Sequence, residues 1–192
     1  MSRSVIVVGG GASGLSAAIT AAESGAEVLL LERLPRVGKK ILLTGNGRCN
    51  LAHAGFDWQR YHGTLPQAKH ILEKFNAAAY FQKLGLYVRA DAEGRQYPCS
   101  GAAESVLDAL RFAAEHAGVQ TRCDTQVTGL LPQKSGWRVC AEHDTWNADA
   151  VILAAGGSAA PNCGTDGNLL PLLKRMGYQV TAPKPALCPI PT

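Results

Sequence analysis

The sequence is poor in aromatic and charged side chains, and it contains no long apolar run. Only 6% of its 192 residues are aromatic and 18% are charged, whereas glycine occurs 21 times. A core with so few rings must be built from small and aliphatic side chains, which favours close-packed helices on a sheet. No stretch approaches the roughly 20 apolar residues of a membrane span. We therefore expect a single α/β layer architecture and no membrane partner.

Targeting and metal-binding patterns are missing as well. The first apolar run begins at Val5, which leaves no room for a signal peptide and predicts a cytoplasmic protein. The six cysteines form no C-x-x-C pair, and the five histidines are scattered without ligand spacing. Cysteines of this kind are typically reduced and buried. We therefore expect free, largely buried thiols and no metal.

The charge is small overall but unevenly placed. A net charge of +4 is too low to indicate a nucleic-acid partner. Between Glu32 and Asp57, however, the sequence has no acid and five cations, namely Arg33, Arg36, Lys39, Lys40 and Arg48. One interpretation is a solvated basic loop. Its position directly after an acid of the nucleotide-binding type favours a second one, in which these cations face cofactor phosphates.

The strongest pattern that is present lies between Val5 and Glu32. An apolar run, Val5–Val8, predicts a buried parallel strand and leads directly into a G-x-G-x-x-G sequence. Small residues then predict a helix over Leu15–Ala22, which Gly25 ends, and Val28–Leu31 predicts a second buried strand. Together these segments form one βαβ unit.

Each part of this unit has a physical role in binding a dinucleotide. Gly9 allows the tight turn, Gly11 lets the backbone approach a pyrophosphate, and Gly14 lets helix and strand pack closely. The phosphates meet the N–H groups and the positive end of the helix dipole. Glu32 follows the first glycine by 23 residues, where an acid accepts hydrogen bonds from a ribose. The unit predicts NAD or FAD, and the acid argues against a 2′-phosphate.

The remaining elements predict a Rossmann-like α/β fold: a parallel sheet with helices on both faces and a three-stranded antiparallel meander as one crossover. Residues 33–65 are expected to be irregular, and Pro66–Gly85 to be a helix with an apolar core stripe that includes Ile71 and Phe75. The other expected elements are short strands at Leu86–Arg89 and Gln96–Pro98, a helix at Ala102–His116, a parallel strand at Val119–Cys123, the meander at Val127–Trp146, a buried strand at Ala150–Ala154, a helix at Leu169–Met176 and an extended segment at Tyr178–Thr181.

The loop Val37–Asn50 has an unusual composition for a connection. Three glycines permit turns against a planar ligand, and four polar side chains accompany them. Any one of these side chains could instead hydrogen-bond the loop to itself. For the loop as a whole we favour contact with the ligand.

Five motifs in order resemble one family of bacterial flavoproteins. They are GGGASG with Glu32, GKKILLTGNGRCN, GRQYPCS, DAVILAAGG and PALCPI. Together they resemble the YhiN-like, BaiN-type flavoproteins, often described as aminoacetone-oxidase-like FAD-binding proteins. The first motif is widespread, whereas the second is specific, and the resemblance covers nearly the whole chain. It implies FAD as the cofactor.

The resemblance also implies which residues contact FAD. The glycine turn would hold the pyrophosphate, Glu32 the adenosine ribose, Val127 the adenine through its backbone, and the Thr44–Asn50 loop the ribityl chain and flavin. Ala155 departs from the usual threonine and weakens one contact. The implied set is Gly9, Gly11, Ala12, Ser13, Gly14, Glu32, Arg33, Gly38, Lys39, Lys40, Thr44, Gly45, Asn46, Gly47, Arg48, Cys49, Asn50, Val127, Ala154, Ala155 and Gly156.

Family members continue into a second domain, so we expect residues 1–182 to be an incomplete FAD-binding domain and 183–192 a proline-rich start of the crossover. The favoured function is an FAD-dependent oxidoreductase, either NAD(P)H-linked or of the oxidase type, that transfers hydride through flavin N5 on an unidentified small molecule, with Arg48 and Asn46 stabilising the reduced flavin. For Cys49 a buried structural role is favoured over a redox role. A non-catalytic fragment that holds only the ADP half is the alternative; a plain NAD domain is disfavoured. Neither the substrate, the catalytic residues nor the oligomeric state is identified, and NAD(P)H is a candidate reductant.

Overall fold

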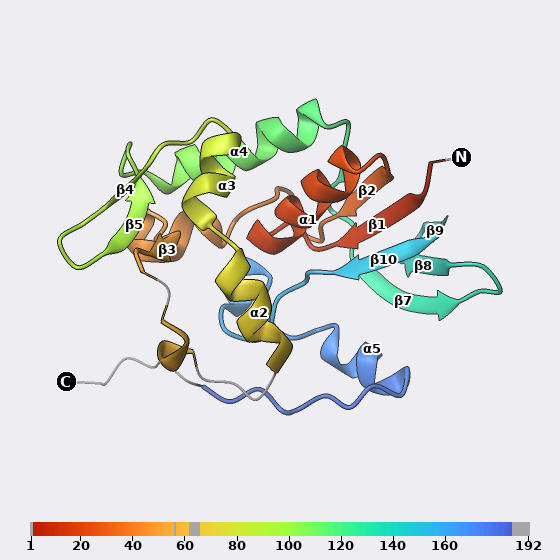
Figure 1. Ribbon diagram of the computed structural model, residues 1–192. Helices are drawn as coiled ribbons and strands as arrows, with labels where there is room; N and C mark the ends of the chain where they lie inside the picture. Colours follow the sequence, from red (N-terminus) through yellow and green to blue (C-terminus); the bar gives the residue numbers. More distant parts are fainter. Residues whose placement is uncertain (1, 56, 62–65, 186–192) are drawn as a thin grey trace. The chain divides into compact units, whose positions relative to one another are not determined.

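The computed structural model describes residues 2–55, 57–61 and 66–185 (Figure 1). The chain forms two compact units. The first unit comprises Met1–Lys40 and Ala114–Thr192, and the second comprises Ile41–Ala113. The boundary expected after residue 182 stays a prediction.

A four-stranded parallel sheet forms the centre of the first unit. Its strands are β1 (Ser4–Val8), β2 (Glu27–Leu31), β6 (Gln120–Arg122) and β10 (Ala150–Leu153), in the order β10-β1-β2-β6. All three pairings are parallel, and Val5 lies opposite Val28 on one side and Ala150 on the other. The strands expected from the apolar runs are therefore confirmed, each within one or two residues of its expected ends.

Different layers cover the two faces of this sheet (Figure 1). Helix α1 (Ala12–Glu23) packs on β1, β2 and β10 through Leu15, Ala18 and Ile19, all of which are buried. On the other face, Ile6 and Val8 join a buried cluster with residues of the meander and of helix α5 (Leu170–Arg175). Each fully buried aliphatic side chain in these layers contributes about 1.5–3 kcal/mol. A helix on each face and the expected meander are thus confirmed.

The meander itself consists of β7 (Val127–Pro132), β8 (Trp137–Ala141) and β9 (Thr145–Ala148), which pair antiparallel in that order. It leads directly into β10. The prediction of a fully buried β10 is wrong, because Leu153 is 39% exposed and, among the described residues, β10 pairs with β1 alone. An edge strand has only one neighbour to cover it.

The second unit contains a small antiparallel sheet and several helices. The sheet has the order β3-β5-β4, formed by β3 (Ala52–His53), β5 (Arg95–Pro98) and β4 (Val88–Ala90). The helices are η1 (Ile41–Gly47), η2 (Trp58–Arg60), α2 (Pro66–Lys74), α3 (Ala77–Lys83) and most of α4 (Ala103–His116). The expected α4 and the two short strands are confirmed.

The prediction of a single helix over Pro66–Gly85 is wrong. Its place is taken by α2 and α3, because the side chain of Asn76 accepts a hydrogen bond from the N–H of Ala79 at 3.0 Å and caps a new helix. The expected core stripe is wrong as well, since Ile71 is 65% and Phe75 56% exposed. Nor does the described Tyr178–Thr181 segment form a strand.

The described cysteines form no disulfide bond with one another, but they are less buried than expected. Cys49 and Cys163 are buried, Cys123 and Cys140 are half-buried, and Cys99 is exposed. Cys188 lies outside the described residues. Within the described ranges, no three His, Cys, Asp or Glu side chains are grouped to hold a metal ion. None of the helices described there has the length and apolar character to cross a membrane.

Candidate nucleotide site

The glycine turn between β1 and α1 brings backbone segments into close contact at two positions. A Cβ atom at Gly9 would lie 2.5 Å from the carbonyl oxygen of Ala154, and a Cβ at Gly14 would overlap the carbonyl oxygen of Gly9. Gly9 also has φ = 107°, which disfavours any other residue. At Gly11, by contrast, a Cβ would meet no atom within 4 Å. Gly9 and Gly14 therefore serve the fold, whereas Gly11 borders open space.

The N-terminus of α1 offers backbone donors to that space. Gly11 is the N-cap residue, no side chain caps it, and the first turn contains no acid. Ala12 and Ser13, the first two helical residues, are exposed. The first N–H groups of a helix have no partner within the helix, and the dipole favours an anion there.

Glu32 lies directly after β2, and its carboxylate is bound on both oxygens. Oε2 accepts a hydrogen bond from the Gly10 N–H at 2.6 Å, and Oε1 accepts one from the Leu34 N–H at 2.8 Å. The residue is only 9% exposed. A carboxylate has about four acceptor positions, so two bonds leave capacity for ribose hydroxyls. Glu32 thus fixes the glycine turn to the chain after β2, and its bond to a ribose stays a prediction.

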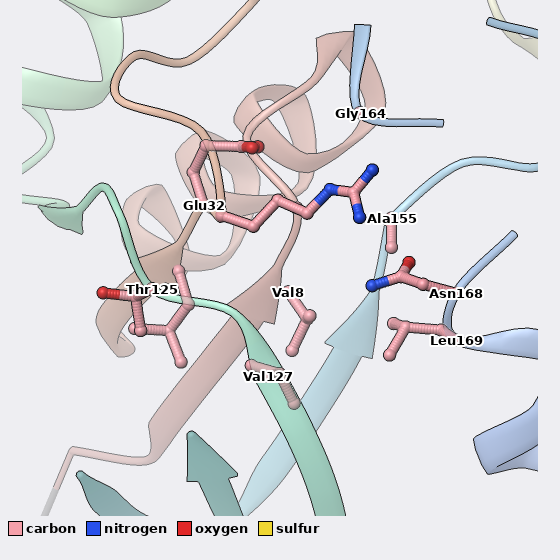
Figure 2. A pocket seen from close by; sticks show the side chains of 11 residues that line it. Val8, Glu32, Thr125, Val127, Ala155, Gly164, Asn168 and Leu169 are labelled. Carbon is pink, nitrogen blue, oxygen red and sulfur yellow. The ribbon is translucent and has the colours of Figure 1, made fainter. Parts of the chain in front are cut away.

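A pocket opens at the carboxyl ends of β1, β2 and β10. It encloses about 330 Å³, open solvent included. Figure 2 shows Glu32 and Thr125 on one side of it and Ala155, Asn168 and Leu169 on the other. The carboxyl end of a parallel sheet is where nucleotides bind in such folds. The lining residues are Val8, Gly9, Leu31, Glu32, Arg33, Thr125, Val127, Ala155, Gly164, Asn168 and Leu169.

Five lining residues belong to the set implied by the resemblance, whereas others were missed. Thr125, Asn168 and Leu169 are among the missed residues. The sequence contained a weak signal for Asn168, because this residue ends a loop, residues 158–168, that contains glycines and an acid. No signal marked Thr125, which lies in the connection before the meander.

Arg33 joins the pocket to the 158–168 loop. Its Nη1 donates to Oδ2 of Asp166 at 2.9 Å, and this bond holds the pKa of Asp166 below its usual value. Gly164, with φ = 83°, packs so closely that a Cβ there would lie 3.4 Å from the Arg33 Nε. This Nε atom is buried and has no acceptor. At the pocket wall, the Nη1 atom of Arg33 therefore has an acceptor, whereas its Nε atom has none.

Two lysines expected near the phosphates donate to the same loop. Nζ of Lys39 lies 2.6 Å from the carbonyl oxygen of Asn162, and Nζ of Lys40 lies 3.4 Å from Oγ1 of Thr165. The cations that follow β2 are thus held by a segment more than 120 positions away. Their expected contact with phosphates, like that of Gly38, Ala154 and Gly156, stays a prediction.

The Thr44–Asn50 loop belongs to the second unit and is strongly bent. Gly45, Asn46, Gly47 and Cys49 all have positive φ, between 55° and 79°. For the two residues that are not glycine this conformation costs of the order of 1–3 kcal/mol each. Hydrogen bonds from the Cys49 N–H to the Thr44 carbonyl and from Thr44 Oγ1 to the Ile41 carbonyl hold the loop.

Within this loop, Cys49 and the polar residues differ in exposure. Burial raises the pKa of the Cys49 thiol, and a hydrogen bond with Thr44 only partly opposes this. A raised pKa keeps the thiol protonated, which agrees with the structural role favoured for it. Asn46, Arg48 and Asn50 are exposed. Their contact with a cofactor stays a prediction.

Comparisons with known proteins identify the family of this chain. The family model of the HI0933-like protein Rossmann domain matches residues 3–184. The 3-dehydro-bile acid delta(4,6)-reductase of Clostridium scindens is 39% identical over 187 residues, which are 94% of this chain and 46% of that protein. The ribosomal RNA dihydrouridine synthase of Escherichia coli is 24% identical over 188 residues, 96% of this chain and 47% of that protein. The chain thus spans a little under half the length of these relatives.

Among solved structures, the open conformation of a flavocytochrome c3 fumarate reductase has the same fold. Its TM-score is 0.65 at 20% sequence identity, over 91% of this chain and 40% of that one. The family match covers nearly all of the chain, and the expected resemblance is confirmed. The chain therefore belongs to the HI0933-like family of FAD-binding Rossmann domains.

Proposed function

We propose that this chain is the FAD-binding portion of an oxidoreductase that reduces a carbon–carbon double bond conjugated to a carbonyl group in a small molecule. The support for the substrate class is chemical. The relative from Clostridium scindens acts on a 3-dehydro bile acid with Δ4,6 double bonds, which are conjugated to the 3-keto group. The ribosomal RNA dihydrouridine synthase of Escherichia coli saturates the double bond of a uracil base in RNA, and this bond is also conjugated to a carbonyl.

The observation that carries the FAD-binding part is the pocket beside Glu32 at the carboxyl ends of β1, β2 and β10, next to the glycine turn that leads into α1. Its polar groups suit the ADP half of FAD. Gly11 leaves room for a pyrophosphate, and the buried Nε of Arg33 lacks an acceptor. Leaving a buried donor unsatisfied costs about 1–3 kcal/mol, so a ligand oxygen or nitrogen at this place would be favourable.

Several lining residues and their neighbours in the first unit then have distinct tasks. Glu32 accepts hydrogen bonds from the ribose hydroxyls, and its charge repels a 2′-phosphate. The N–H groups of Ala12 and Ser13 donate to the pyrophosphate, with Lys39 and Lys40 adding positive charge. Val127 offers its backbone to the adenine, and Ala155 lies on the opposite wall. These tasks orient the cofactor, and they leave its reactive ring to other residues.

The bound flavin supplies hydride transfer at its N5 atom. In the second unit, the exposed side chains of Asn46 and Arg48 would stabilise negative charge on the reduced ring, because the first can donate hydrogen bonds and the second is a permanent cation. Cys49 keeps the loop in its bent form. A nicotinamide, NADH or NADPH, would be the hydride donor.

A second candidate is a non-catalytic nucleotide-binding fragment that holds only the ADP half of the cofactor. One observation favours it: every residue that lines the pocket belongs to the first unit, whereas Thr44–Asn50 belongs to the second. The ADP half can bind without the second unit. In this case residues 1–182 bind nucleotide, and 183–192 begin a crossover to a catalytic partner segment.

The test is retention of flavin. The purified chain is saturated with FAD and desalted, and its flavin absorbance is recorded before and after anaerobic addition of NADH or NADPH. We expect the flavin to be retained and to lose its absorbance when the nicotinamide reduces it. The absorbance should return on addition of 4-androstene-3,17-dione, which reoxidises the flavin, but not with the saturated 5α-androstane-3,17-dione. Complete loss of flavin, with ADP still bound in equilibrium dialysis, would favour the fragment. Equal reoxidation by both steroids would rule out the conjugated double bond as substrate.

A further inference from the structure

Tyr97 lies in the GRQYPCS motif, to which the proposed function gives no role. We propose that Tyr97 is a positioning residue that fixes the guanidinium of Arg48 and thereby tunes the reduction potential of the flavin. This inference rests on the proposed function, in which Arg48 stabilises the negative charge of the reduced ring. Tyr97 acts only through Arg48.

The contact between the two side chains is direct. The guanidinium carbon of Arg48 lies 4.5 Å from the centroid of the Tyr97 ring, within the range of a cation–π interaction. Tyr97 is 8% exposed, whereas Arg48 is exposed. At an exposed site such a contact favours the stacked arrangement by about two- to fivefold. One face of the guanidinium is therefore held, and its edge stays accessible.

The ring itself is rigidly placed. Tyr97 belongs to β5, the central strand of the β3-β5-β4 sheet, and lies opposite Arg89 of β4. On the other side of β5, Gln96 lies opposite Ala52 and accepts a hydrogen bond from the Leu51 N–H at 2.8 Å. A residue in a strand that pairs on both sides has little backbone freedom. The ring can therefore serve as a fixed platform.

The loop that carries Arg48 packs on the same ring. A Cβ at Gly45 would lie 3.4 Å from Cε1 of Tyr97 and 2.6 Å from the N atom of Asn50. Arg48 follows Gly47 and precedes Cys49, both of which have positive φ. Tyr97 thus touches the start of the bend through Gly45 and its end through Arg48. The Tyr97 ring therefore helps to set the position of the cation, together with the hydrogen bond from the Arg48 N–H to the Gly45 carbonyl at 3.2 Å.

The charge of Arg48 is not neutralised within the described part of the second unit. Asp91, whose carboxylate senses the Arg48 charge, is bound by Arg95, with Nε donating to Oδ2 at 2.7 Å. No described carboxylate lies within ion-pair distance of Arg48. A stacked cation without a counter-ion raises the potential of a nearby group that gains negative charge on reduction.

The first experiment tests the contact without any cofactor. In the NMR spectrum of the apo chain, the δ-methylene protons of Arg48 should be shifted upfield by the ring current. Tyr97→Phe should keep this shift, because it keeps the ring, and Tyr97→Leu should abolish it. An unshifted Arg48 in the wild-type chain would overturn the inference whether or not FAD binds.

The second experiment tests the effect on the flavin. In the FAD-loaded chain, Tyr97→Leu and Arg48→Gln should each lower the midpoint potential of the flavin, and Tyr97→Phe should leave it unchanged. The double variant that combines Tyr97→Leu with Arg48→Gln should have a potential no lower than that of Arg48→Gln alone. The control is Arg111→Gln, an exposed cation on α4, which should have no effect. If Tyr97→Leu does not fold, Arg48→Gln and Tyr97→Phe still decide. A wild-type potential in Arg48→Gln, or a lowered one in Tyr97→Phe, would overturn the inference. Loss of FAD by the wild-type chain would instead contradict the proposed function.

Discussion

At the scale of single residues, the acid of the dinucleotide motif has two tasks. Glu32 is expected to bind a ribose, and in the structure it already binds the backbone of Gly10 and Leu34. Both partners are N–H groups, so both bonds need an acceptor. The same carboxylate therefore shapes the pocket and is expected to bind the ligand, so its removal should affect stability as well as binding.

Glu32→Gln tests this double task. A glutamine keeps the shape but presents one NH2 group where an acceptor is needed, so one of the two N–H groups loses its partner. We expect the free energy of unfolding to fall by about 1.5–3 kcal/mol, the range for hydrogen bonds to charged groups, and the affinity for FAD to fall as well. Urea denaturation and FAD titration measure the two effects. Glu27→Gln, at the exposed start of β2, should change neither; equal stability of the Glu32 variant and the wild type would contradict the assignment.

Asp166 should make the free energy of unfolding depend on pH in the acid range. Its pKa is lowered in the folded state by Arg33, so its contribution is present above its ordinary value of 3.8 and is lost as the pH falls through and below that value. In the variant Asp166→Asn, the free energy of unfolding should therefore decrease less steeply between about pH 5 and pH 2 than in the wild type. Arg33→Gln should flatten the same window, and the double variant should go no further. Urea denaturation across this range checks it; an unchanged acid slope in both single variants would exclude the pair.

The sequence predicted some of the pocket residues and not others, for a physical reason. Gly9 and Glu32 lie in one local βαβ unit, whose spacing alone indicates their positions. Thr125 and Asn168 reach the pocket from distant connections, and only the packed fold brings them there. Arg33 shows the same limit, because its partner Asp166 lies 133 positions away.

At the scale of elements, the β1–α1 turn separates the demands of folding from those of binding. Gly14→Ala places a Cβ against the Gly9 carbonyl, so the free energy of unfolding should fall by about 3 kcal/mol or more. Gly11→Ala meets no protein atom and should cost less than about 1 kcal/mol, yet its methyl group would occupy the expected pyrophosphate position. Thermal unfolding and FAD titration of both variants check this. Full FAD affinity in Gly11→Ala would show that no pyrophosphate approaches there.

The break between α2 and α3 gives a second prediction at this scale. Asn76→Ala removes the cap of α3 and should lower the free energy of unfolding by about 1 kcal/mol. Gln82→Ala, an exposed position in the same helix, is the matched control and should be neutral. Urea denaturation of the two variants distinguishes them. Equal stability of Asn76→Ala and the wild type would mean that the cap adds nothing.

The same break shows what periodicity alone could predict. The apolar spacing correctly indicated helix, but it also indicated a buried face, and Ile71 and Phe75 are exposed. Spacing says which residues share a face, whereas burial depends on what covers that face. For β1 and β2 the covering layers exist in the first unit, so the buried strands predicted there are confirmed, whereas β6 forms as predicted but is exposed.

At the scale of the whole molecule, the chain leaves the first unit after β2 and returns to it through α4. The parallel sheet is therefore completed only when β6 and β10 pair with strands more than 90 positions earlier. Such non-local pairing depends on closing a long loop, whose cost grows only slowly with its length. A ligand that binds the ends of β1 and β2 stabilises the folded sheet, because it binds the native state alone.

A panel of three nucleotides turns this linkage into a test of the cofactor. At a concentration 100 times its Kd, a ligand that binds only the native state stabilises it by about 2.7 kcal/mol. We expect FAD and ADP to raise the thermal midpoint of the chain, because both carry the adenosine diphosphate that fits beside Glu32, and FMN, which lacks it, to raise it less than either. If FAD exceeds ADP at equal concentration, the flavin half contacts the protein, as an oxidoreductase requires. If the two are equal, the chain holds only the ADP half; a larger shift with FMN than with ADP would contradict the site itself.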